Sequence, residues 1–416
     1  FSILQNPEYK SPLSVSFKDV SVSEVDERTV QFTLKEPFAP FLSTLTVGIL
    51  PGQIWDLVAP RNALLAEVNL RPIGSGPYAF DKFSKDKFGN IRSYTLTRNP
   101  DYYGEPAKIS RLTFRFYPDA LNAADALEKQ NVEGVSFLPG EVESQFLNDR
   151  DIQLVRPSLP QYTALFLNEV HAPFLKDVNM RKALTQAIDK QALVNGPLSG
   201  HGRVTDSPIL PGMPGFRDDL KQPPYDIAAA KAVIDTYRAT LAADKQTIAL
   251  EITTIDSPEF TSVAEFIKAA WAAIGVETTV KAVDVSSLQT DVLRERQYDV
   301  LLSGELLGAD PDPYPFWHSS QVDYPGLNIA LYANRKADTL IDEARSAIDP
   351  AVRIDKYQQL TELLIEDLPA IFLYQPTYTY AVSSKIKGVN IPSILVPADR
   401  FGNVNSWYIK SKHVLH

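Results

Sequence analysis

A strand–helix–strand pattern over residues 247–283 constrains the fold more than any other part of the chain. Residues 247–255 alternate apolar and polar side chains, which is typical of a half-buried strand. Ser257 then stands as a helix N-cap, with Pro258 at the first helical position. An apolar helical face follows, and residues 276–283 alternate again. Two strands joined through a helix run parallel with a right-handed crossover, so the sequence predicts an α/β fold.

The rest of the second half has the same character. Asp177 and Asp349 precede helical patterns as N-cap residues, and Pro369 ends the second of these helices. Two apolar runs, at residues 298–304 and 370–374, predict buried strands. We therefore expect helices and strands to alternate from about residue 160 onward.

The first 120 residues are dominated by strand patterns instead. Val30, Phe32 and Leu34 alternate with polar residues, and the turn-forming residues 26–28 before them predict a hairpin. The tail from Tyr378 onward is too short to form its own domain. We expect it to return and pack on the first region, which makes that domain discontinuous.

Charge and composition exclude several classes of protein. The chain has 41 Lys+Arg against 51 Asp+Glu, a net charge of −10, which argues against a general nucleic-acid binder. It has no cysteine, which excludes disulfides, thiolate metal sites and cysteine nucleophiles. No apolar run approaches the length that crosses a bilayer. We therefore expect no nucleic-acid partner and no membrane-spanning segment.

The start of the chain does not look like the start of a protein. The first residue is Phe1, and no positively charged, apolar signal region follows it. We expect the sequence to be a processed or truncated piece whose targeting segment lay upstream.

The motifs that could carry catalysis or bind a metal are weak. Residues 74–78 contain two glycines, but Pro77 has no N–H to offer a phosphate, which favours a structural turn. His318 lies near Asp310 and Asp312, which could suggest a site for a hard cation. However, three prolines make this loop rigid, and it lacks the Asp/Asn/Gly spacing of a calcium-binding loop. There is no G-x-S-x-G elbow and no P-loop. We expect no catalytic residues, no metal and no cofactor.

Several segments, in order along nearly the whole chain, resemble the family 5 extracellular solute-binding proteins of ABC importers, which include oligopeptide, dipeptide and nickel receptors. No segment is decisive alone, but the ordered set is specific. The matching segments are 74–80, Arg98 to Gly104, Tyr162 to Asn168, Phe174 to Leu184, Ala187 to Lys190, Pro208 to Gly212, Tyr298 to Gly304 and Asp310 to Pro313.

The resemblance implies a two-lobed periplasmic-binding-protein-like fold (type II, class C) with a hinged cleft. Lobe 1 would comprise residues 1–159 and 377–416 and lack its N-terminal part, and lobe 2 would comprise residues 160–376. It also implies a monomeric, extracytoplasmic receptor that hands its solute to ABC permease subunits. Any membrane contact would come from a lipid anchor upstream of this sequence.

The resemblance suggests site residues by position, with one departure from the family pattern. Peptide receptors of the family place a Trp after the glycine that ends the 298–304 strand, and an Asp for the peptide amine shortly after it. Here Glu305 follows that glycine and the Asp is absent. We expect Glu305 or Asp310 to replace it, since an ammonium needs a desolvated carboxylate. The alternative for Glu305 is a solvated or salt-bridged hinge residue.

The remaining candidates for ligand contact come from the same positional argument. They are Leu306 beside Glu305, Tyr162 and Tyr374 near the two chain crossings, Arg203 as a partner for a carboxylate, and Asn328 as a hydrogen-bonding amide. The alternative for Arg203 is that it is an ordinary surface residue with no role in binding.

Four functions stay open on the sequence alone. The main prediction is a receptor for an oligopeptide or peptide-like solute. An oligosaccharide receptor of the same family is the second, since aromatic platforms would suit sugars. A sensor domain of a transcription regulator is the third, and an enzyme is the fourth, although no positive feature supports it.

Overall fold

The computed structural model describes the chain except residues 10, 139, 243–245 and 410–416, and it divides into two compact units. Unit 1 comprises Phe1–Glu36, Thr44–Leu159 and Tyr378–His416. Unit 2 comprises Pro37–Ser43 and Pro160–Thr377.

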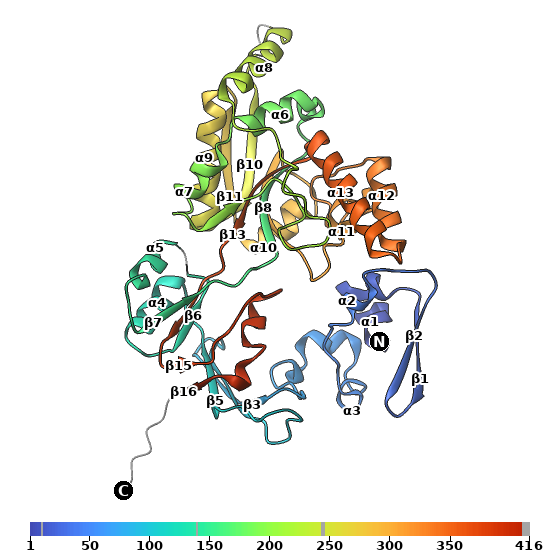
Figure 1. Ribbon diagram of the computed structural model, residues 1–416, viewed down its shortest axis with the longest axis vertical. Helices are drawn as coiled ribbons and strands as arrows, with labels where there is room; N and C mark the ends of the chain where they lie inside the picture. The colour runs from blue at the N-terminus through green and yellow to red at the C-terminus, as the bar shows by residue number, and fades with distance from the viewer. Residues whose placement is uncertain (10, 139, 243–245, 410–416) are drawn as a thin grey trace. The chain divides into compact units, whose positions relative to one another are not determined.

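Unit 2 is built on a six-stranded mixed sheet with the strand order β11-β10-β12-β8-β13-β9 (Figure 1). Strands β10, β11 and β12 run parallel to one another, whereas β8 pairs antiparallel with both β12 and β13. The strands are β8 (Gln161–Leu167), β9 (Gly202–Val204), β10 (Ala249–Ile255), β11 (Glu277–Val283), β12 (Val300–Leu306) and β13 (Ala370–Pro376).

The predicted strand–helix–strand unit is confirmed. Strand β10 and strand β11 are parallel neighbours, joined by helix α9 (Pro258–Ala273). The Ser257 hydroxyl caps the helix by accepting a hydrogen bond from the Phe260 N–H at 3.4 Å. Gly275 follows the helix with a φ of 86°, a left-handed conformation that glycine adopts without strain.

Helices cover both faces of the unit 2 sheet, each over its own apolar cluster. Even-numbered residues of β12 such as Leu302 pack with α9, where the Trp271 indole donates to the Leu184 carbonyl at 3.0 Å. Odd-numbered residues such as Leu301 pack against the opposite helices. We call these the α9 face and the α13 face. The α9 face carries α6 (Val178–Gln186), α7 (Lys190–Asn195), α8 (Ile227–Thr240) and α9; the α13 face carries α11 (Tyr314–Trp317), α12 (Arg335–Ser346) and α13 (Pro350–Asp367).

Unit 1 contains several small sheets rather than one large one. The predicted hairpin is present, because β1 pairs antiparallel with β2. Strand β14, in the chain's tail, pairs antiparallel with both β6 and β7. The strands are β1 (Val20–Asp26), β2 (Thr29–Leu34), β3 (Tyr78–Lys85), β4 (Ile91–Arg98), β5 (Arg111–Arg115), β6 (Gly134–Ser136), β7 (Ile152–Val155), β14 (Tyr380–Ser383), β15 (Ile386–Lys387) and β16 (Tyr408–Ile409).

Short helices interrupt the strand-rich start more than the sequence predicts. They include α1 (Ser2–Gln5) and α3 (Gly52–Trp55); the helices α4 (Ala120–Glu128) and α5 (Gly140–Glu143) follow that region. No helix in the described part of the chain is both long and apolar enough to span a bilayer.

The units divide between Leu159 and Pro160 and between Thr377 and Tyr378, and the segment Pro37–Ser43 belongs to unit 2. The Ala39 N–H donates to the Arg345 carbonyl at 2.7 Å. The Arg345 guanidinium also lies over the Phe38 ring, 4.7 Å from its centroid. No periodicity in the sequence signals this long-range contact.

Candidate ligand-binding site

Tyr162 and Glu305 form the central pair among the predicted site residues. They stand directly opposite each other on the antiparallel strands β8 and β12. Both side chains point to the α13 face, where the Tyr162 hydroxyl donates a hydrogen bond to Glu305 Oε2. Adjacent antiparallel strands therefore bring together two residues that lie 143 positions apart in the sequence.

The Glu305 carboxyl group is almost completely removed from water. The residue is 5% exposed, and its second oxygen, Oε1, has no hydrogen-bond partner within the described residues. Burial raises the pKa of Glu305 to about 8, against a smaller lowering by the Tyr162 hydroxyl. The side chain is therefore predominantly a neutral acid at pH 7, with unused hydrogen-bonding capacity at Oε1.

Aromatic rings surround Tyr162. Its ring meets the Phe372 ring edge-on at a centroid distance of 5.3 Å, and Phe372 in turn lies 5.9 Å from Trp317. Burial, and then the Glu305 carboxyl, raise the pKa of Tyr162 well above its ordinary value. Tyr162 therefore acts as a fixed neutral hydrogen-bond donor.

Asp310 lies in the loop that follows β12 and already has a cationic partner. Its carboxylate contacts the Arg353 guanidinium, which also donates to the Tyr357 hydroxyl at 2.6 Å. The neighbouring Asp312 lies 3.2 Å from Arg345 Nε. Each of these acids therefore pairs with an arginine, Arg345 of α12 or Arg353 of α13. The sequences of the two helices do not indicate this pairing.

Tyr374 is buried in β13, but on the α9 face, so it does not join Tyr162 and Glu305. Its hydroxyl donates to Glu259 Oε1 at 3.0 Å, in the first turn of α9. Burial and the Glu259 carboxylate raise the pKa of Tyr374 well above its ordinary value. The two tyrosines predicted at the chain crossings thus serve opposite faces of one sheet.

The other three candidates occupy different settings. Arg203 is exposed on the edge strand β9, opposite Gln375. Leu306, at the end of β12, is 44% exposed. Asn328 is fully buried, and its side-chain amide donates to the His318 and Tyr332 carbonyls at 3.1 and 2.9 Å. Its oxygen accepts from the Tyr332 N–H, so this amide holds a loop together.

The structure brings no metal-binding set together in the described part of the chain. His318 Nδ1 lies 2.7 Å from the Ser320 hydroxyl, whereas Asp310 and Asp312 pair with arginines as above. The three residues considered as hard-cation ligands therefore have other partners.

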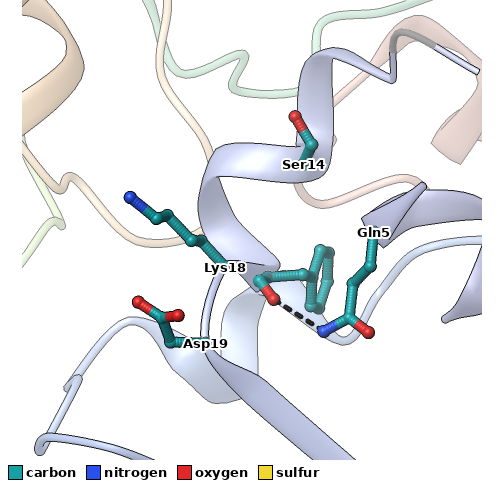
Figure 2. A pocket seen from close by; sticks show the side chains of 5 residues that line it. Gln5, Ser14, Lys18 and Asp19 are labelled. Carbon is teal, nitrogen blue, oxygen red and sulfur yellow. Dashed lines mark hydrogen bonds between the residues drawn. The ribbon is translucent and has the colours of Figure 1, made fainter. Parts of the chain in front are cut away.

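A pocket of about 320 Å³ lies in unit 1, and none of the predicted site residues lines it. Figure 2 shows Gln5, whose amide donates to the Phe17 carbonyl at 2.9 Å, next to Ser14, Lys18 and Asp19. The same amide also donates to the Val20 carbonyl at 2.6 Å. Gln5 therefore fastens the start of the chain to β1, and sequence patterns did not indicate this pocket.

Comparison with known proteins identifies the family. Residues 1–325 match the model of the bacterial extracellular solute-binding proteins, family 5 Middle. The chain belongs to this family. A similar curated protein is the probable D,D-dipeptide-binding periplasmic protein DdpA of Escherichia coli (strain K12), with 27% identity over 393 residues, or 91% of this chain and 72% of that protein. The family's members bind solutes, which agrees with the main prediction from sequence.

Solved structures confirm the two-lobed fold of this solute-binding protein. The oligopeptide-binding protein AppA of Bacillus subtilis, in complex with a nonapeptide, superposes with a TM-score of 0.82 at 24% identity, over 99% of this chain and 82% of that one. NikZ of Campylobacter jejuni, in complex with Ni(L-His), gives a TM-score of 0.82 at 25% identity, over 97% and 82%. The α/β architecture expected from the sequence is therefore correct.

Proposed function

We propose that this solute-binding protein captures a short peptide or peptide-like solute outside the cytoplasm and delivers it to the permease of an ABC importer. Similarity over nearly the whole chain to proteins named for dipeptide and oligopeptide binding carries the proposal. None of the three relatives described above is named for sugar binding or for gene regulation. The oligosaccharide and sensor alternatives consequently have weaker support.

Capture would proceed by hinge closure of the two lobes, with ligand contacts shifting an open–closed equilibrium. The partners of the protein would be the solute and the permease subunits. We further propose that the receptor is a monomer, that it is held at the membrane by a lipid anchor upstream of residue 1, and that it has no catalytic residues.

The predicted ligand residues support a peptide ligand to different degrees. Glu305 offers a carboxyl oxygen without a partner, and Arg203 offers an exposed guanidinium for a terminal carboxylate. Because Asp310 already pairs with Arg353, Glu305 is the better candidate for a carboxyl group that contacts the solute. Tyr162, Leu306, Asn328 and Tyr374 stay proposals as ligand contacts.

Native mass spectrometry tests the function directly. The purified protein is incubated at pH 7 with an equimolar mixture of synthetic peptides of two to nine residues, and in parallel with a mixture of oligosaccharides. We expect peptide complexes to persist and sugar complexes to be absent. Retention of sugars without any peptide would overturn the proposal, and calorimetry on the retained species would then define the true ligand.

A further inference from the structure

The buried Glu305 differs from the other acids at the end of β12. Asp310 contacts Arg353 and Asp312 lies beside Arg345, so each has a cation to neutralise it. Within the described residues, the only titratable side chain that acts on Glu305 is Tyr162, a hydrogen-bond donor without charge. Glu305 is thus the one of these three acids that has no cation in contact with its carboxyl group.

A neutral carboxyl group has one O–H donor and one carbonyl acceptor. The Tyr162 hydroxyl donates to Oε2, which assigns the carbonyl role to Oε2 and leaves the proton on Oε1. Oε1 has no partner of its own within the described residues. A buried donor without an acceptor costs about 1–3 kcal/mol, so an acceptor supplied from outside would be stabilising.

We propose that Glu305 recognises the solute as a neutral acid, donating a hydrogen bond from Oε1 to an amide carbonyl oxygen of the bound peptide. This inference rests on the proposed function and adds the chemistry of one contact. Oε1 is buried, and the exposed Leu306 beside it points to the opposite face of the sheet, so this contact requires the Glu305 side chain to rotate toward the end of β12 when the solute binds. The contact selects for carbonyl oxygen and not for a solute cation.

The alternative is that Glu305 binds as a carboxylate and pairs with a peptide ammonium. Because burial raises the pKa of Glu305 to about 8, that pairing requires the group to lose a proton on binding at pH 7. The two modes therefore differ in proton exchange, in the direction of their pH dependence and in their response to an amide substitution.

The test measures the affinity for tetra-alanine, or for the tightest peptide of the mixture above if tetra-alanine is not retained. Calorimetry is run from pH 6.5 to pH 9.5 on the wild-type protein, on Glu305→Gln and on Glu366→Gln, an exposed acid at the end of α13 that serves as the matched control. Affinities are divided by those of Glu305→Gln at the same pH, which cancels the titration of the peptide itself.

The neutral-donor mode predicts that Glu305→Gln binds within about threefold of wild type at pH 6.5, because its amide is also a donor. The relative affinity of the wild type then falls about 30-fold by pH 9.5, as a group with a pKa of about 8 ionises. Calorimetry at pH 7 in buffers of different ionisation enthalpy shows less than about 0.2 proton released. The Glu366→Gln variant behaves as wild type.

Each opposite outcome is distinct. A loss of more than tenfold in Glu305→Gln at pH 6.5, with close to one proton released, establishes the carboxylate–ammonium mode and overturns the inference. Identical pH profiles in wild type and Glu305→Gln overturn it as well, while leaving the peptide receptor intact. A wild-type protein that binds no peptide of the mixture overturns the proposed function together with the inference.

Discussion

Two acid sites lie at the end of β12 and in the loop after it, one buried and one half-buried, and they are built in opposite ways. At the end of β12, Glu305 meets a tyrosine hydroxyl in aromatic surroundings and is favoured as a neutral acid. A few residues later, Asp310 and Asp312 meet Arg353 and Arg345. The partner therefore separates the two sites: an arginine fixes a carboxyl group in the fold, whereas a tyrosine leaves one oxygen of Glu305 without a partner among the described residues.

Removing the cation from the arginine-paired site should have the largest effect. Arg353→Met leaves Asp310 without its cation and removes the hydrogen bond to Tyr357. We expect the free energy of unfolding to fall by about 3–5 kcal/mol in urea denaturation. Adding Asp310→Asn to that variant should restore part of the loss. A single variant as stable as wild type would show that the pair does not hold the loop.

The pH dependence of stability should separate the two sites. The pKa of Glu305 is raised to about 8 in the folded protein, so the folded state binds more protons than the unfolded state between about pH 4.5 and 8. The contribution of Glu305 to the free energy of unfolding is therefore largest below pH 4.5 and is lost as the pH rises from 4.5 to 8. We expect the stability of wild type relative to Glu305→Gln to fall by up to about 4 kcal/mol between pH 4.5 and pH 9. A difference independent of pH would contradict a neutral Glu305.

Much of the architecture followed from the sequence, because local rules determine it. The α9 unit was predicted from Ser257, Pro258 and alternating strands, each of which acts over a few residues. The pairing of Glu305 with Tyr162 depends on which strands become neighbours, and the pairing of Asp310 with Arg353 depends on how α13 docks. Neither has a local signal, so the sequence proposed these acids as candidates but could not assign their partners.

Tyr162→Phe should have an intermediate effect. The variant keeps the ring contact with Phe372 but removes the donor to Glu305 Oε2. We expect a loss of about 1–3 kcal/mol in thermal unfolding, since a second buried oxygen then lacks a partner. An unchanged melting temperature would mean that the hydrogen bond contributes little and that Glu305 is held by packing alone.

Arg203→Ala should have the smallest effect on stability. Arg203 is exposed on an edge strand, so we expect the free energy of unfolding to change by less than about 0.5 kcal/mol. If the guanidinium receives a peptide carboxylate, affinity should fall at least about tenfold for free peptides and stay unchanged for C-terminally amidated ones. Equal losses for both kinds of peptide would argue against that role.

The protonation state of Glu305 at pH 7 tests the central claim of this comparison most directly. A difference infrared spectrum between wild type and Glu305→Gln, recorded at pH 7 and again at pH 9.5, reports the carbonyl stretch of a protonated carboxyl group. We expect this band at pH 7 and its disappearance at pH 9.5, because the pKa of Glu305 is about 8. A carboxylate signal at pH 7 would show that Glu305 is ionised, and the distinction between the two sites would be wrong.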